Sequence, residues 1–168
     1  MALHESVVSV HGSLLGLDKD GYQVGDRKGV ATTTITSTQL LALNATAQSV
    51  VPALGAGLAC VPYRVAIYKP AGTAYAGVAS GEDLVLKYTN ASGAQCSSVI
   101  ETTGFLDQTT AQTRVAGFPG STTTTAGDVT PVANSAVVLS LLSGEITTGD
   151  SPLYVRVWFD VIDTVFTA

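Results

Sequence analysis

The side chains that most often carry catalysis or bind metal ions are scarce in this sequence and widely separated. The only histidines are His4 and His11, and residues seven positions apart on a strand point to opposite faces, so we expect no shared metal ion. The only thiols are Cys60 and Cys96, which form no CxxC pair and are too few for a zinc site. We therefore expect no metal ion and no other cofactor.

The two cysteines leave two alternatives open. Cys60 and Cys96 could be small buried side chains on strands, or they could form a disulfide with each other. A reducing cytoplasm favours the two free thiols.

The chain also lacks a convincing nucleophile or acid–base pair. Hydrolases often hold their serine in a strained GxSxG elbow, whereas Ser80 in the run GVASG is one residue out of register. The carboxylate pairs Glu82 with Asp83 and Glu101 with Asp107 lie beside Gly or Thr in turn-like sequence, which favours solvated loop carboxylates. We therefore expect that the chain is not an enzyme.

Two glycine-containing runs resemble binding loops only in part. A calcium loop that begins at Asp18 needs Gly at its sixth position and Glu at its twelfth, but Gln23 and Gly29 occupy these positions. Residues 55–57 read GAG, yet a phosphate-binding loop opens a helix, whereas this run precedes an expected strand. We interpret residues 55–57 as a turn.

Asn44 and Asn90 each begin a match to the N-glycosylation sequence. Such a match matters only in a secretory pathway, and the N-terminus lacks a basic region ahead of its apolar residues and carries Glu5, so it does not resemble a secretion signal. We interpret residues 90–93 as a hairpin turn between strands.

Composition narrows the class of protein further. The chain has 168 residues, about one domain, with 46% hydrophobic and only 12% charged residues, and Thr, Ser and Gly fill many surface positions. A net charge of −5 argues against nucleic-acid binding, because affinity for phosphates comes mainly from Lys and Arg. The apolar runs are too short to cross a bilayer, so no membrane association is expected.

Short apolar runs with a period of two, separated by Gly, Pro, Asn or Asp, predict an all-β protein. The clearest run is 153–162, in which Leu153, Val155, Val157, Phe159 and Val161 share one face and Tyr154, Arg156, Trp158, Asp160 and Ile162 share the other. Strands are expected at residues 30–36, 38–43, 48–51, 59–68, 83–89, 112–116, 136–142 and 153–162. In the second of these regions, we expect the leucines of the run ITSTQLLAL to enter the core.

Other local signals qualify this picture. Pro62 predicts that the 59–68 strand begins there, lies at an edge or carries a bulge. On the same strand, alternation places Tyr63 on one side with Val65 and Ile67. Residues 39–47 could form one or two helical turns, the 97–107 region is ambiguous, and residues 117–135 are expected to form a long surface loop.

The first thirty residues differ from the rest, because they hold seven of the twenty-one charged residues. We interpret residues 1–30 as an N-terminal arm in which residues 6–11 could form one strand. The remainder, residues 31–168, is expected to form an antiparallel β-sandwich of jelly-roll type with about eight strands.

Three blocks of the sequence resemble small jelly-roll proteins of tailed bacteriophages that decorate or cement the outer surface of the capsid. The blocks are TTTITSTQLLALNATAQSVVPALGAGLACVPYRVAIYKPAGTAYAG, EDLVLKYTN and ANSAVVLSLLSGEITTGDSPLYVRVWFDVID. The resemblance runs from Thr32 to Asp163, and the arm and the loop expected at residues 117–135, which contains four successive threonines, depart from it. It rests on the order of low-complexity blocks and carries no catalytic residues.

The resemblance implies a structural virion protein that is made in the host cytoplasm, binds the major capsid protein on the outside of the shell and forms a homo-oligomer, either a trimer or a dimer. Apolar residues on both faces of the last strand agree with a surface covered by a partner. The residues expected to contact a neighbouring copy or the capsid are Leu3, His4, His11, Leu15, Tyr22, Arg27, Tyr154 and Trp158.

A second hypothesis is a carbohydrate-binding or receptor-binding jelly-roll module of a phage head or tail. Its stacking platform would consist of Tyr68, Tyr75, Tyr88, Tyr154 and Trp158.

Overall fold

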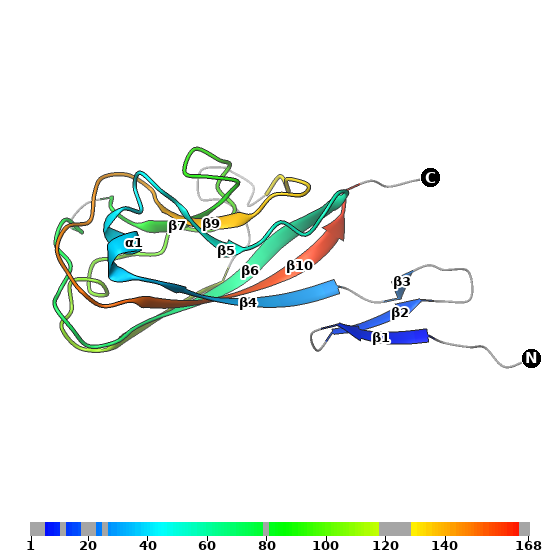
Figure 1. Cartoon of the computed structure of the whole chain (residues 1–168), viewed down its shortest axis with the longest axis horizontal. Helices are drawn as coiled ribbons and strands as arrows, with labels where there is room; N and C mark the ends of the chain where they lie inside the picture. The colour runs from blue at the N-terminus through cyan, green and yellow to red at the C-terminus, as the bar shows by residue number, and fades with distance from the viewer. Residues whose placement is uncertain are drawn as a thin grey trace, which may run out of the picture.

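A computed structural model describes residues 6–10, 13–17, 23–24, 27–78, 81–117 and 129–164, with side chains from Lys28 onward. Seven strands form two antiparallel sheets (Figure 1). These strands are β4 (Arg27–Ile35), β5 (Gln48–Val51), β6 (Leu58–Lys69), β7 (Leu84–Tyr88), β8 (Gln112–Gly117), β9 (Val137–Leu141) and β10 (Leu153–Asp163). The all-β prediction is therefore confirmed.

Each sheet joins strands that are distant in the sequence. The larger sheet has the order β4-β10-β6-β8 and the smaller one the order β5-β9-β7. A segment that follows β7 returns along it through two isolated bridges, Lys87 with Gln95 and Leu84 with Ile100. The turn that starts this return is closed by the Gly93 N–H, which donates to the Asn90 carbonyl at 2.9 Å, as expected for residues 90–93.

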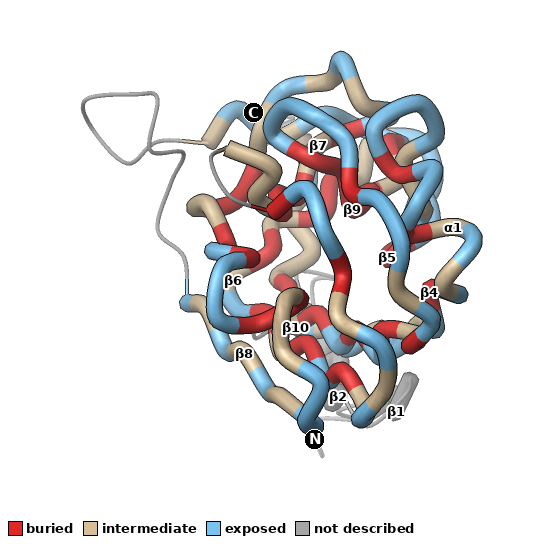
Figure 2. Tube along the Cα trace, turned by 90° about the vertical axis from the view of Figure 1, so that its left-hand side faces the viewer, coloured by how far each residue is buried: buried red, intermediate tan, exposed pale blue. Residues whose placement is uncertain are grey.

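One hydrophobic core lies between the two sheets. Ile67 of β6 and Val155 of β10 contribute to it from the larger sheet, and Leu86 of β7 and Leu139 of β9 contribute from the smaller sheet. Figure 2 shows buried residues along β6, β10, β7 and β9. The alternation predicted for residues 153–162 is present, since Leu153, Val155, Val157 and Phe159 are buried between more exposed neighbours.

The two sheets differ in what covers their outer sides. All five residues of β9 are buried, and Val85 of β7 and Val138 of β9 are buried although they lie outside the core cluster. The smaller sheet is therefore covered on both faces along these two strands. On the larger sheet, β8 and β10 alternate between less and more exposed positions, so its outer face is open to solvent.

The strand predicted at residues 38–43 is wrong, and the alternative of one or two helical turns at 39–47 is confirmed in part, because a short helix, α1 (Ser37–Leu41), occupies this region. Thr36 caps the helix: its hydroxyl accepts from the Gln39 N–H at 3.2 Å, and its own N–H donates to the Gln39 side chain at 2.9 Å. The helical spacing buries Leu40 and Leu43 completely and leaves Leu41 37% exposed. Two of the three leucines thus enter the core, from a helical turn and the residues after it.

Pro62 lies at a β-bulge, one of the outcomes predicted for it. The pairing of β10 with β6 shifts register here, since Trp158 faces Arg64 and Phe159 faces Pro62, which leaves Tyr63 without a partner. The Tyr63 ring lies 6.0 Å from the Lys28 ammonium, and Lys28 is the pairing partner of Asp160 on the outer face. The bulge therefore separates Tyr63 from Val65 and Ile67, with which simple alternation grouped it.

Three further strands form a separate antiparallel sheet with the order β1-β2-β3. They are β1 (Ser6–Val10), β2 (Ser13–Leu17) and β3 (Gln23–Val24), and Figure 1 shows them beyond the start of β4. β4 begins at Arg27, so the last residues of the range assigned to the arm already belong to the larger sheet. The predicted loop at 117–135 lies mostly outside the described residues.

No helix within the described residues is long and apolar enough to cross a membrane.

Candidate interaction face

The open side of the larger sheet is the most distinctive surface of the described residues, and we call it the aromatic face. Backbone pairing arranges it as three rows of four residues across β4, β10, β6 and β8. The first row holds Val30, Trp158, Arg64 and Gly117; the second holds Thr32, Arg156, Ala66 and Val115; the third holds Thr34, Tyr154, Tyr68 and Thr113.

Four large side chains of this face are exposed to an unusual degree. Val30 is 58% exposed, Val115 54%, Tyr154 45% and Tyr68 43%. Exposed apolar groups scattered singly are ordinary on soluble proteins, but a contiguous group of them is typical of an interaction surface. Strand pairing makes these four side chains parts of one surface.

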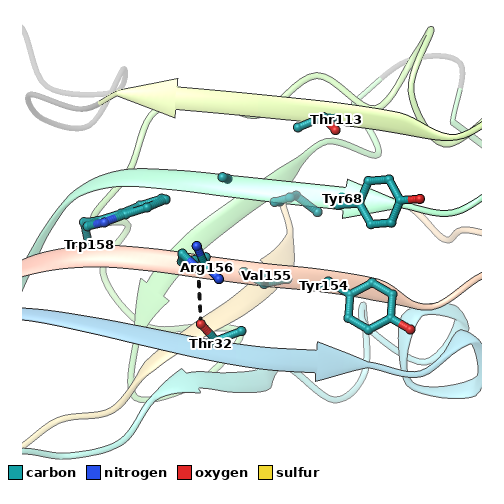
Figure 3. A pocket seen from close by; sticks show the side chains of 9 residues that line it. Thr32, Tyr68, Thr113, Tyr154, Val155, Arg156 and Trp158 are labelled. Atoms are coloured by element: carbon teal, nitrogen blue, oxygen red, sulfur yellow. Dashed lines mark hydrogen bonds between the residues drawn. The ribbon is translucent and has the colours of Figure 1, made fainter. Parts of the chain in front are cut away.

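The two tyrosines form one wall of a shallow hollow, and Trp158 forms the opposite wall (Figure 3). The Tyr68 and Tyr154 rings are stacked with centroids 6.0 Å apart and an interplanar angle of 30°. Ala66 also lines the hollow, and its small side chain leaves space between the two walls. The hollow holds about 220 Å³, below the roughly 300–1,000 Å³ of pockets that enclose small molecules, so it fits one side chain of a partner.

Two arginines hold the Trp158 indole. The Arg64 guanidinium carbon lies 5.0 Å from the ring centroid and that of Arg156 lies 5.9 Å from it. The Arg156 Nε also donates to the Thr32 hydroxyl at 3.4 Å, across to β4. Cation–π contacts at exposed sites contribute about 0.5–1 kcal/mol each, so the arginines favour one position of the indole.

The residues predicted to contact partners fall into three groups. Tyr154 and Trp158 lie on the aromatic face, where the pairing of β10 and β6 brings them together with Tyr68. Leu15 lies in β2 and Arg27 begins β4, but their side chains are not described. Leu3, His4, His11 and Tyr22 lie outside the described residues.

The stacking platform proposed for a carbohydrate module is wrong in two of its five members. Tyr75 is 2% exposed and Tyr88 is 1% exposed, so both belong to the core. The Tyr75 hydroxyl donates to the Ser151 carbonyl at 2.5 Å, and the Tyr88 hydroxyl donates to the Cys60 carbonyl at 2.6 Å. Tyr68, Tyr154 and Trp158 remain at the surface.

Sequence reasoning missed three members of the aromatic face, Val30, Arg64 and Val115, and it missed the contact of Arg156 with the Trp158 ring. Alternation along β4 and β8 could have shown that Val30 and Val115 point outward. That they lie beside β10 and β6 depends on the strand order, which alternation does not contain.

Both cysteines are buried free thiols, as in the first of the two alternatives, but only Cys60 lies on a strand, β6; Cys96 lies in the segment that follows β7. Burial raises the pKa of Cys96 to about 12. Burial, followed by the neighbouring charges of Cys96 and Asp160, raises the pKa of Cys60 even further above its usual range. A thiol that stays protonated is a poor nucleophile, so neither cysteine is poised for catalysis.

The candidate carboxylates stabilise turns. Asp83 Oδ1 accepts from the Thr102 N–H at 3.1 Å, and Glu101 Oε1 accepts from the Thr103 N–H at 3.1 Å. That backbone hydrogen bond lowers the pKa of Glu101, and the side-chain amide of Gln108 lowers that of Asp107. A general acid at neutral pH needs a raised pKa, so these shifts run in the opposite direction.

Ser80 lies outside the described residues. Residues 55–57 form the expected turn, in which the Leu58 N–H donates to the Gly55 carbonyl at 3.2 Å as β6 begins. Across the described residues, no three His, Cys, Asp or Glu side chains gather as a metal-binding group.

No protein-family model, no curated protein and no solved structure matches the chain.

Proposed function

We propose that the chain is a structural virion protein that binds the outer surface of a tailed-phage capsid and stabilises the shell. The observation that carries the proposal is the aromatic face, an exposed sheet surface with Tyr68, Tyr154 and Trp158 on adjacent strands. A decoration protein acts through contact area rather than through reactive groups. Burial of apolar surface contributes roughly 25 cal/mol per Å², reduced by the cost of ordering the contact.

The fold that goes with this proposal is a jelly roll. In a jelly roll the first strand pairs with the last, the second with the last but one, and so on inward. The pairs β4 with β10, β5 with β9 and β6 with β8 follow this nested order, and the return of residues 95–100 along β7 supplies a fourth pair. This nesting supports the jelly-roll assignment.

The size of the aromatic face supports a homo-oligomer, a trimer or a dimer. Four strands about 4.8 Å apart and three rows about 7 Å apart give a patch of about 400 Å² with its side chains. Stable interfaces bury about 800 Å² on each partner, so one such face would bind weakly. Several copies joined in one particle would bind the shell together, and simultaneous attachment multiplies the affinity.

Within this proposal the arm joins the protein to a neighbouring copy or to the shell. Because β4 begins at Arg27 and pairs with β10 from there, the deletion that tests the arm removes residues 1–26 only. The truncated protein should keep its core, measured as an unchanged urea midpoint, and should no longer bind capsids. Retained capsid binding would refute this role for the arm.

The main test measures co-sedimentation of the purified protein with empty, expanded phage heads, together with light scattering to obtain its own mass. We expect saturable binding and heads that resist higher temperature. The double variant Tyr68→Thr/Tyr154→Thr should lose binding while folding normally, because both rings are on the surface. Leu142→Thr is the matched control, since Leu142 is 41% exposed and is not part of the aromatic face. Equal binding by the double variant would overturn the proposal.

Carbohydrate binding is a second candidate, because the walls of the hollow are aromatic and sugars stack on such rings. A glycan array distinguishes the two. Glycan binding that disappears in Trp158→Ala, together with no binding to heads, would favour the carbohydrate module.

A further inference from the structure

The charge of the aromatic face is opposite to that of the whole chain. The chain has a net charge of −5, yet the three rows contain Arg64 and Arg156 and no carboxylate, and in the next row of the same outer face the charge of Asp160 is matched by that of its pairing partner Lys28. Within the described residues neither guanidinium forms an ion pair; both lie against Trp158. Their charges are therefore available to a partner at the edge of an apolar hollow.

This pattern disfavours a second copy of the same face as the occupant. Pairing two identical faces would bring four guanidiniums together, while the carboxylate of Asp160 lies in the next row beside Lys28; like charges across an interface are strongly unfavourable. The pattern instead favours a partner that supplies negative charge.

The hollow narrows the chemistry of that partner further. Trp158, Ala66 and the Tyr68–Tyr154 pair form an apolar space that a solvated phosphate chain would leave unfilled. Nucleic-acid binding also draws its affinity from many Lys and Arg contacts, and this face provides two arginines among its three rows. A polypeptide can present an apolar side chain and carboxylates within the same few residues.

We propose that the aromatic face recognises an acidic polypeptide surface, which inserts an apolar side chain between Trp158 and the two tyrosines and pairs carboxylates with Arg64 and Arg156. That this surface belongs to a capsid shell rests on the proposed function; the chemistry of recognition rests on the face alone. Exposed charge pairs are screened by salt, so binding should weaken as ionic strength rises from about 0.05 M to about 0.5 M.

Trp158 allows a direct test because it is the only tryptophan in the chain. Its fluorescence is titrated with a short capped peptide of glutamate and leucine, and with the same peptide carrying glutamine in place of glutamate. The acidic peptide should change the emission and saturate at low salt, and the glutamine peptide should bind at least about fivefold more weakly, which corresponds to about 1 kcal/mol.

Charge reversal identifies the arginines. Arg64→Glu and Arg156→Glu should each weaken binding of the acidic peptide about fivefold or more, because an attraction of up to about 1 kcal/mol becomes a repulsion. Arg156→Lys should keep most of the affinity because it keeps the charge. Lys87→Glu is the charge-matched control because Lys87 lies in β7 of the other sheet; its ammonium donates to the Ala91 carbonyl at 2.6 Å, so its folding is checked by its urea midpoint, and the folded variant should bind as the wild type does.

Several results would overturn the inference. These are no response to the acidic peptide, equal binding of the glutamine peptide, equal weakening by Lys87→Glu, or stronger binding of oligothymidylate or of an oligosaccharide. Head binding separates the two proposals. A response to the acidic peptide without head binding would support the inference and reject the capsid function. Head binding that Arg64→Glu and Arg156→Glu leave unchanged would support the capsid function and reject the inference.

Discussion

Neighbouring leucines in α1 provide a sharp test of how the region after β4 folds. Leu40 is 0% exposed and belongs to the core, whereas Leu41 is 37% exposed. In the structure Leu40 and Leu43 point inward together. In a strand over residues 38–43, Leu41 and Leu43 would share a face and Leu40 would lie on the other. Leu40→Ala and Leu41→Ala therefore make the same chemical change with different expected costs.

The burial of the two side chains determines how much unfolding free energy each substitution should remove. Leu to Ala removes about 2.4 kcal/mol of transfer free energy at about 0.8 kcal/mol per carbon group, and the cavity left at Leu40 raises the loss to about 3–4 kcal/mol. Leu41 is 37% exposed, so about two-thirds of the transfer term applies and no closed cavity remains. Its loss should stay below about 1.5 kcal/mol.

Urea unfolding followed by far-ultraviolet circular dichroism measures both losses. With a slope near 2 kcal/mol per molar urea, the midpoint should fall by about 1.5–2 M for Leu40→Ala and by less than about 0.8 M for Leu41→Ala. The slope itself should not change. A larger loss for Leu41→Ala, or equal losses for both variants, would refute the helical turn and the burial derived from it.

Three further predictions concern the core and one surface loop. Tyr88→Phe removes the hydrogen bond to the Cys60 carbonyl and should destabilise the fold by about 1–2 kcal/mol in urea. Cys60 and Cys96 should not react with Ellman's reagent in the native protein, because burial covers both thiols and raises their pKa values. Both should react in urea, where unfolding exposes them. The hydrogen bond from the Thr73 N–H lowers the pKa of Asp150 in the folded protein. The ionised Asp150 carboxylate therefore stabilises the fold at pH values above its pKa in the unfolded chain, and this stability is lost as the pH falls through its lower pKa in the folded protein. Asp150→Asn should thus lose less stability than the wild type between about pH 5 and pH 3.

Alternation predicted most strands of the two sheets because each apolar run has one face against the core. The predicted 59–68, 83–89, 112–116, 136–142 and 153–162 strands correspond to β6, β7, β8, β9 and β10. The strand prediction failed at residues 38–43, where Leu-Leu-Ala-Leu fits either period, and the helical turns allowed at 39–47 were the better alternative. The missed signal is Thr36 followed three residues later by Gln39, the sequence of a capping box.

Tyrosine burial shows a second limit of alternation. Tyr88 in β7 and Tyr154 in β10 both lie in alternating runs, yet Tyr88 is buried and Tyr154 is exposed. Alternation shows which residues share a face, but it does not show which face meets the core. That depends on segments that arrive from elsewhere in the chain, such as the residues that cover the outer side of the smaller sheet.

The aromatic face is determined by topology in the same way. Trp158 meets Arg64 because β10 lies beside β6, about ninety residues earlier in the chain, and Val30 completes the row because β4 pairs with the other edge of β10. The sequence pattern correctly identified Tyr154 and Trp158 as outward-facing. Their partners required the strand order and the bulge at Pro62, which sets the register between β10 and β6.

Arg64 and Arg156 affect both self-association of the aromatic face and its binding to a partner. An exposed group of tyrosine, tryptophan and valine would favour association between identical copies, which removes apolar surface from water. The two guanidiniums make that pairing repulsive, while their stems and planes cover part of Trp158 and keep the indole in place. The same charges that oppose self-pairing attract a carboxylate-rich surface. The face can thus remain open in solution and still bind a partner of opposite charge.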